Sequence, residues 1–170
     1  MKRMSVAACT VAALASAALM AYAAHPRDTA KLTLNGKTVT VEYGRPSLNG
    51  RTINDMLGQL PEGEVWRLGA DTSTTFTTSG DLKFGDVAIP KGEYSLWARK
   101  EAGGNWKLVF NKQHGQWGTQ HDAAQDLAAV PLMLEKEKSA DLVTITLENE
   151  KGAGEISVQW GEMELSATFK

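Results

Sequence analysis

The chain has 170 residues, of which 42% are hydrophobic and 22% charged, and its net charge at neutral pH is −2. Its 18 basic residues form no run and are outnumbered by 20 acidic residues, so nucleic acids and anionic membrane surfaces are poor candidates as partners. The sequence contains a single cysteine, which excludes a framework of disulfide bonds.

The first 23 residues have the three parts of a secretory signal peptide. Two basic residues come first, an uncharged run over residues 5–20 follows, and Ala21-Tyr22-Ala23 supplies the small-x-small pattern of a signal-peptidase site. We therefore expect residues 1–23 to be a signal peptide and the protein to be periplasmic or secreted. Two alternatives stay open, a membrane anchor that is retained and lipid attachment at Cys9.

Cleavage there leaves residues 24–170 as a single domain with no membrane span. This part has 16 basic and 20 acidic residues, a net charge of −4, and no cysteine. A chain of this size buries roughly two-thirds of its unfolded surface, so the core must stabilise the fold without disulfide bonds.

The predicted secondary structure is mostly β. Two alternating stretches, residues 30–35 and 37–43, flank Asn35-Gly36, the preferred pair for a two-residue hairpin turn. Further short β-type runs follow, separated by turn residues, at 65–68, 74–78, 81–84, 93–100, 105–110, 130–134, 142–147, 156–160 and 163–169. Because of Pro131, the run 130–134 is expected to be an edge strand. About ten short strands predict an all-β fold, a single antiparallel β-sandwich or jelly-roll-like domain.

One short helix interrupts this pattern. Thr52 can cap it, with Asp55 three residues later, and Pro61 ends it. Apolar residues at helical spacing over 53–60 predict a stripe that covers an open edge or end of the sheets.

Two stretches combine tryptophan, glycine and polar side chains. They are Gly63–Asp71, with the sequence GEVWRLGAD, and Phe110–Asp122, with the sequence FNKQHGQWGTQHD. We expect them to form opposite walls of one cleft.

Four motifs in order carry a family resemblance. They are RPS with GR at 45–51, GEVWRLGAD with TTF at 63–76, PxGxYSL at 90–96 and FNKQHGQWGTQHD at 110–122. From about residue 31 to the C-terminus the chain resembles the bacterial family called domain of unknown function 2911. The resemblance implies an exported bacterial domain, and the family has no established activity. The family usually has asparagine at Asp71, an acid at Thr72, tyrosine at His121 and no fixed histidine at His114.

Several side chains of the cleft are candidates for ligand binding. Tryptophan offers a large apolar face and one donor, which suits a half-polar ligand such as a sugar ring. The candidate residues are Arg45, Trp66, Arg67, Asn111, Gln116, Trp117 and His121. The alternative for the tryptophans is a place in the core, and the alternative for Arg67 is an ion pair with Asp71 or Glu64. Trp106 and Trp160 are expected in the core.

Other residues are candidates for catalysis or metal binding. Glu64 and Asp71 are the pair of carboxylates that could serve in acid/base catalysis. His114, His121 and Asp122 have the ligand types of a zinc site, but their spacing fits no known ligand pattern, so we expect no metal and no cofactor. His25 follows the cleavage site and is expected to be disordered.

Three functional hypotheses follow. The first is an exported, non-catalytic β-sandwich that binds a small molecule, a glycan or a protein partner in the cell envelope. The second is a carboxylate- or metal-dependent hydrolase of the cell envelope, and the third is a purely structural envelope protein. The sequence leans against an enzyme, because it lacks a G-x-S-x-G elbow, a phosphate loop and a dinucleotide motif.

Overall fold

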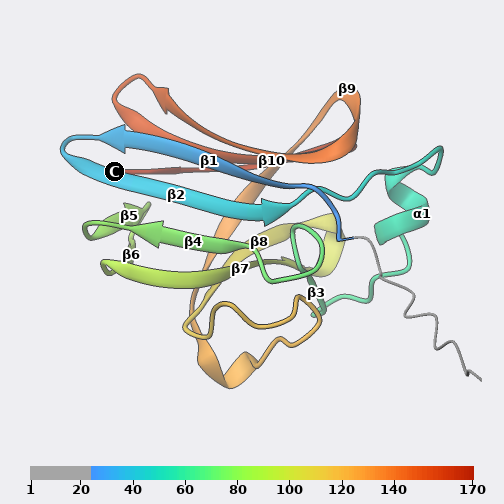
Figure 1. The fold of residues 1–170 in the computed structure, drawn as a ribbon, viewed down its shortest axis with the longest axis horizontal. Coiled ribbons are helices and arrows are strands. Elements are labelled where there is room, and N and C mark those ends of the chain that lie inside the picture. The colour runs from blue at the N-terminus through green and yellow to red at the C-terminus, as the bar shows by residue number, and fades with distance from the viewer. Residues whose placement is uncertain (1–23) are drawn as a thin grey trace, which may run out of the picture.

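Ten strands, one α-helix and two short 3₁₀ helices make up residues 24–170, the part of the chain that the computed structural model describes (Figure 1). In chain order they are β1 (Arg27–Leu34), β2 (Lys37–Gly44), α1 (Ile53–Leu57), β3 (Val65–Trp66), β4 (Thr75–Thr78), β5 (Leu82–Phe84), β6 (Val87–Ile89), β7 (Gly92–Lys100), η1 (Ala102–Gly104), β8 (Trp106–Asn111), η2 (Ala123–Gln125), β9 (Asp126–Glu150) and β10 (Ala153–Phe169). The predicted signal peptide and Cys9 lie outside these residues.

β1 and β2 form the hairpin that the sequence predicts. Asn35 and Gly36 both have positive φ, 50° and 75°, as a two-residue turn of this kind requires. The pairing continues from Leu34 opposite Lys37 to Arg27 opposite Gly44. The alternation of β2 places its apolar side chains in the core.

A curled antiparallel sheet contains most of the strands. Its order is β1-β2-β4-β7-β8-β9-β10, with β3 paired to β7, while β5 and β6 form a separate hairpin. The segment after β2 bridges β9 through Ser47 and Leu142, so the sheet folds back towards itself. In Figure 1, β9 passes behind β2 and β4 and then runs with β10 near β1 and β2. The predicted all-β, sandwich-like fold is confirmed.

Aromatic side chains fill the centre of the core. The ring of Phe110 lies 5.3 Å from that of Phe76 and 5.2 Å from that of Phe84, and Phe84 in turn lies 5.2 Å from Phe169. These contacts join β4, β5, β8 and β10. Trp106 and Trp160 are buried as predicted, with 6% and 3% of their surface exposed.

The C-terminal half differs from the prediction of four short strands. β9 is one continuous strand that pairs with β8 over residues 126–132 and with β10 over residues 133–150. β10 is also continuous, because Gly161, with φ +60°, forms a bulge in the pairing where the sequence suggests a turn. The prediction for Pro131 holds, since this part of β9 has only β8 as a paired neighbour.

The helix α1 begins where the sequence places it but is shorter. Thr52 and Asp55 form a complete capping box, and the α-helix ends at Leu57, ahead of the predicted end before Pro61. Ile53, Met56 and Leu60 pack against the core, so this turn covers one end of the sheet.

Within residues 24–170 no helix has the length and apolar character needed to cross a membrane.

Candidate functional site

The two stretches singled out in the sequence lie against each other. Thr72 and Trp117 form an isolated β-bridge. The N–H of Gly118 donates to the carbonyl of Asp71 at 2.7 Å, and the N–H of Ser73 donates to the carbonyl of Gln116 at 2.9 Å. At Gly118 a Cβ atom would stand 2.7 Å from the Asp71 carbonyl oxygen, so only glycine permits this approach. The backbone itself therefore fixes the two segments together.

A pocket of about 430 Å³ opens where the two segments meet α1 and β7. The first stretch contributes Glu64, Val65, Trp66 and Arg67, the second contributes Gly118, Thr119 and His121, and the remaining lining residues are Leu57, Leu60 and Trp97. Its lining joins two tryptophans and two leucines to a carboxylate, a guanidinium and an imidazole. Such a mixture of apolar surface and polar groups suits a small ligand that has both kinds of group.

Two tryptophans form the rigid part of this pocket. Trp66 is buried and stacks on Trp160, with ring centroids 5.6 Å apart and planes at 10°. Trp97 is buried as well, and its indole N–H donates to Ser95 Oγ at 2.9 Å. Trp66 therefore belongs to the core, as the alternative from the sequence proposes, and also lines the pocket.

His121 contributes the most closely held polar group. Its Nε2 lies 2.9 Å from Asp126 Oδ1, and its ring lies 4.9 Å from the ring of Trp97. The same Asp126 oxygen accepts a hydrogen bond from Asn111 Nδ2 at 2.8 Å. Imidazole is thus oriented by a carboxylate that is itself positioned, an arrangement that can bind a hydroxyl or exchange a proton.

Glu64 and Arg67 add the two opposite charges of the pocket. Both line it, and Arg67 is only partly exposed. Within residues 24–170 neither side chain takes part in an ion pair, so the pair of Arg67 with Glu64 or Asp71 that the sequence suggests does not form. Both groups can therefore bond to a ligand without breaking a salt bridge.

Asp71 is held by the N-terminal segment and does not line the pocket. Its Oδ2 accepts a hydrogen bond from the backbone N–H of His25 at 2.7 Å, and the ring Nδ1 of His25 lies 3.3 Å away. Burial raises the pKa of Asp71, but the hydrogen bonds from His25, together with electrostatic attraction to His25 and Arg67, outweigh it and leave this pKa below its usual value. The expectation that His25 is disordered was wrong, because a buried carboxylate holds it. Glu64 and Asp71 consequently do not share the pocket.

The residues considered for a metal are dispersed. His114 Nδ1 lies 3.6 Å from Glu93, whereas His121 contacts Asp126. Asp122 caps the 3₁₀ helix η2 by accepting from the N–H of Ala124 at 3.0 Å. No three His, Cys, Asp or Glu side chains among residues 24–170 converge as metal ligands would.

Three predicted ligand-binding residues are bonded within the fold. Arg45 donates from Nε to the Val143 carbonyl at 3.0 Å, which ties the end of β2 to β9. Asn111 is fully buried and donates to the Asp122 carbonyl at 2.8 Å. Gln116 donates to Ser95 Oγ at 3.2 Å. None of the three lines the pocket.

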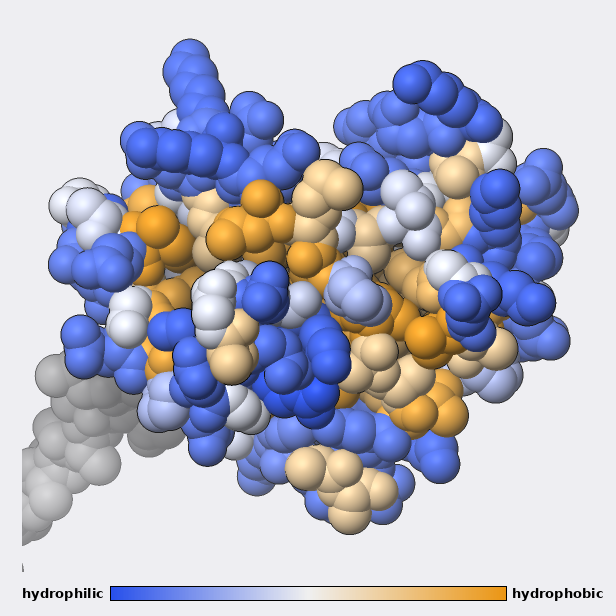
Figure 2. Space-filling view, turned by 180° about the vertical axis from the view of Figure 1, so that it is seen from behind, coloured by the Kyte–Doolittle hydropathy of each residue, from blue (hydrophilic) through white to orange (hydrophobic). Residues whose placement is uncertain are grey.

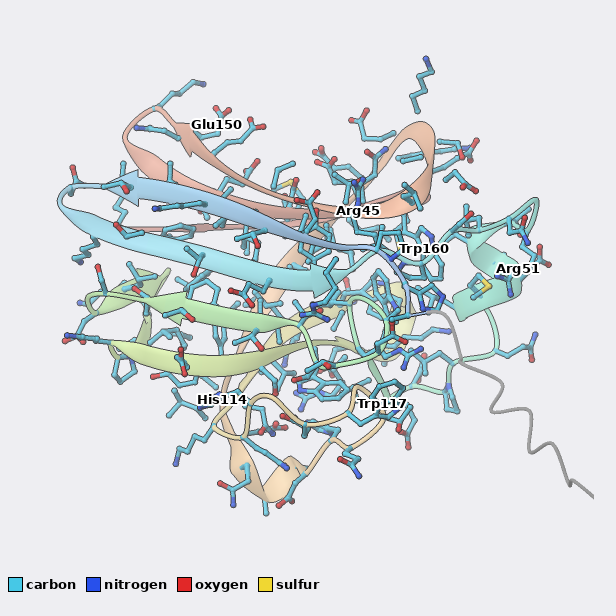
Figure 3. All side chains as sticks on the ribbon, viewed as in Figure 1. Arg45, Arg51, His114, Trp117, Glu150 and Trp160 are labelled. Carbon is cyan, nitrogen blue, oxygen red and sulfur yellow. The ribbon has the colours of Figure 1, made fainter. Side chains whose placement is uncertain are left out.

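Trp117 lies on the same loop but outside the pocket. Its side chain is 49% exposed, so it is not a core residue. Figure 3 shows it well separated from His114 along the loop and from Arg45, which lies towards β9 and β10. Trp117 is thus available at the surface beside the pocket.

Sequence reasoning missed Trp97 and Asp126. β7 is buried from Tyr94 to Ala98 without alternation, so its pattern does not tell which side chains meet a pocket. Asp126 lies five positions after His121, and the residues between them include a 3₁₀ turn, so only the folded loop brings the two side chains together. Leu57 and Leu60 could be expected near the pocket, because they belong to the apolar stripe of the predicted helix.

Comparison with known proteins gives a family and no activity. No curated protein and no solved structure matches the chain. The model of a family described as a protein of unknown function, DUF2911, matches residues 25–169, almost the whole of the described domain. The chain therefore belongs to the DUF2911 family.

Proposed function

We propose that this chain is an exported, non-catalytic binding protein whose ligand occupies the pocket between residues 63–71 and 110–122. One observation carries the proposal: both stretches line a single pocket in which Trp66 and Trp97 stand beside the polar groups of Glu64, Arg67 and His121. Packing alone does not require three ionisable side chains of different kinds around one opening.

The pocket suits a small, half-polar molecule. Its volume of about 430 Å³ lies within the range of small-molecule sites. Indole rings offer apolar contact, while carboxylate, guanidinium and imidazole can bond to several hydroxyl groups or to one charged group. A glycan of the cell envelope combines apolar faces with hydroxyl groups in this way, and so do many small metabolites. Trp117, at the rim of the pocket, would add a contact for a larger ligand or a protein partner.

Thermal unfolding of residues 24–170 in the presence of N-acetylglucosamine oligomers and other soluble envelope glycans tests the proposal. A ligand at about a hundred times its Kd adds roughly 2.7 kcal/mol to the free energy of unfolding, which raises Tm by several degrees. We expect at least one compound to do so, and we expect His121→Ala to abolish that rise.

His114→Ala is the matched control, because His114 lies on the same loop but outside the pocket. It should leave the rise in Tm unchanged. If both histidine variants respond alike, or if no compound of the panel changes Tm, the third hypothesis of a purely structural protein is favoured instead.

The contact between His121 and Asp126 favours a second candidate, a hydrolase in which His121 acts as general base. At 2.9 Å, Asp126 can orient the imidazole and stabilise its protonated form. Chromatography of the glycans after the same incubations distinguishes the hydrolase from the binding protein. Cleaved glycan whose formation stops in Asp126→Asn would support the hydrolase, and intact glycan with a raised Tm would support binding alone.

A further inference from the structure

A second hollow lies where β10 separates from β9. The two strands pair up to Ser166 opposite Met133 and then diverge. Between them, a groove of about 420 Å³ is lined by Val130, Leu132 and Met133 on β9, by Ala167 on β10 and by Phe84 of β5. The groove shares no lining residue with the pocket of the proposed function.

One large apolar side chain of this groove, Met133, is exposed to solvent. Met133 has 62% of its surface exposed, the highest fraction among the large apolar side chains of residues 24–170. Leu134, which follows it in β9, is also exposed but does not line the groove. Figure 2 shows the molecule from behind, with apolar residues spread across the middle of this face and hydrophilic residues around them. Exposed apolar surface of this kind, rimmed by polar groups, typically marks a site of interaction.

Glutamates accumulate along the two-stranded ribbon that β9 and β10 form. Glu155, which lines the groove, stands opposite Glu148, and Glu164 stands opposite Glu135. None of these four forms an ion pair within residues 24–170. Like charges opposite each other destabilise a sheet, so the ribbon retains a repulsion that a cationic partner would relieve.

Lys136, which follows Glu135 in β9, does not neutralise this charge. Lys136 is paired at 2.9 Å with a different acid, Glu162. Burial, together with repulsion from Glu150, Glu135 and Glu148, raises the pKa of Glu155. An apolar groove with an unpaired carboxylate on its wall therefore complements a ligand that combines apolar and positively charged groups.

We propose that this groove binds a segment of a partner protein in which lysine or arginine side chains accompany apolar ones. The apolar side chains would enter between Leu132, Met133 and Ala167, while the cations would meet Glu148 and Glu155. Side chains rather than backbone carry the recognition, because Pro131 lacks the N–H that an added strand would need on this edge of β9.

Fluorescence anisotropy with a labelled ten-residue peptide of alternating lysine and valine tests the proposal on residues 24–170. We expect saturable binding at low salt that weakens as salt is added. Replacement of both Glu148 and Glu155 by glutamine should weaken it at least about tenfold, because it removes the charges that meet the cations. Met133→Ser, at a largely exposed position, should weaken it about fivefold through the lost apolar contact.

The control variant carries Glu42→Gln and Glu62→Gln, which change the net charge equally at exposed positions outside the groove. It should stay within about twofold of the parent protein, as expected for charges away from the contact. Equal weakening in this control, or equal affinity for a peptide with serine in place of valine, would overturn the proposal by showing general attraction to an acidic protein. Absence of binding, or full competition by spermidine, would overturn it as well.

Discussion

Asp71 illustrates how one side chain can join distant parts of this chain. It adopts φ +62°, a left-handed conformation in which Asp and Asn are the best tolerated residues after glycine. Its carbonyl holds the loop at Gly118 and its carboxylate holds His25. The residue is therefore structural, although the sequence makes it a candidate for catalysis.

Asp71→Asn should lower the free energy of unfolding by about 1 kcal/mol at pH 7, because the amide keeps the conformation but loses the charged acceptor. The pKa of Asp71 is lowered in the folded state. Its contribution is thus complete above the unfolded value near 4 and disappears as pH falls through the folded pKa. Chemical unfolding of both proteins at pH 7 and pH 3 measures this, and a difference that stays constant between the two pH values would contradict it.

Residue types alone identified four of the ten residues that line the pocket. Trp66, Arg67, His121 and Glu64 were found because tryptophan and charged residues are unusual together in short loops. Asn111 and Gln116 have the same polar character, yet both are bonded inside the fold. Whether a polar side chain meets a ligand or another residue depends on non-local neighbours, which sequence spacing does not specify.

At the scale of elements, α1 is the clearest case of local determination. Its capping box satisfies backbone donors at the helix start, and the turn that follows places Leu57 and Leu60 in the pocket wall. Such a short helix has little stability of its own. The cap and the packing must therefore act together.

Thr52→Ala should lower the free energy of unfolding by about 1 kcal/mol, since it removes the hydroxyl that accepts from the Asp55 N–H. Thr29→Ala, at an exposed threonine in β1, is the control and should have a smaller effect. Thermal unfolding followed by circular dichroism compares them. Equal losses in the two variants would show that the capping box contributes little.

The long strands β9 and β10 show where local signals mislead. Glycine at position 161 is typical of a turn, but Gly161 forms a bulge within one continuous strand. The choice between turn and bulge is made by whether the next residues continue to pair with the neighbouring strand, and here Met163 pairs with Lys136. That pairing joins residues far apart in sequence.

Across the whole molecule, the acidic balance is concentrated on the ribbon of β9 and β10. Burial and repulsion among glutamates raise the pKa of both Glu155 and Glu164. In each case protonation favours the folded state. The charged glutamate therefore lowers the free energy of unfolding fully above the folded pKa, and this destabilisation disappears as pH falls below that value towards the unfolded pKa.

Glu155→Gln combined with Glu164→Gln should therefore raise the free energy of unfolding at pH 7, by roughly 0.2–1 kcal/mol for each opposed pair relieved. The gain should vanish towards pH 3, where the parent glutamates are protonated. Denaturant unfolding across this pH range measures both effects. A gain that persists at pH 3 would assign the effect to packing and not to charge.

The sequence by itself determined the first hairpin, the capped helix, the all-β class and the two stretches that meet at the pocket. In each case the signal is local: a turn pair with positive φ, a capping box, strand alternation, or a dense group of unusual residue types. Only the tertiary structure decided that Trp97 and Asp126 complete the pocket, that Asp71 binds His25, and that β9 and β10 diverge to open a groove. These features depend on contacts between residues far apart in the chain or on the exact path of a loop, and such contacts arise when the sheet curls and its faces pack.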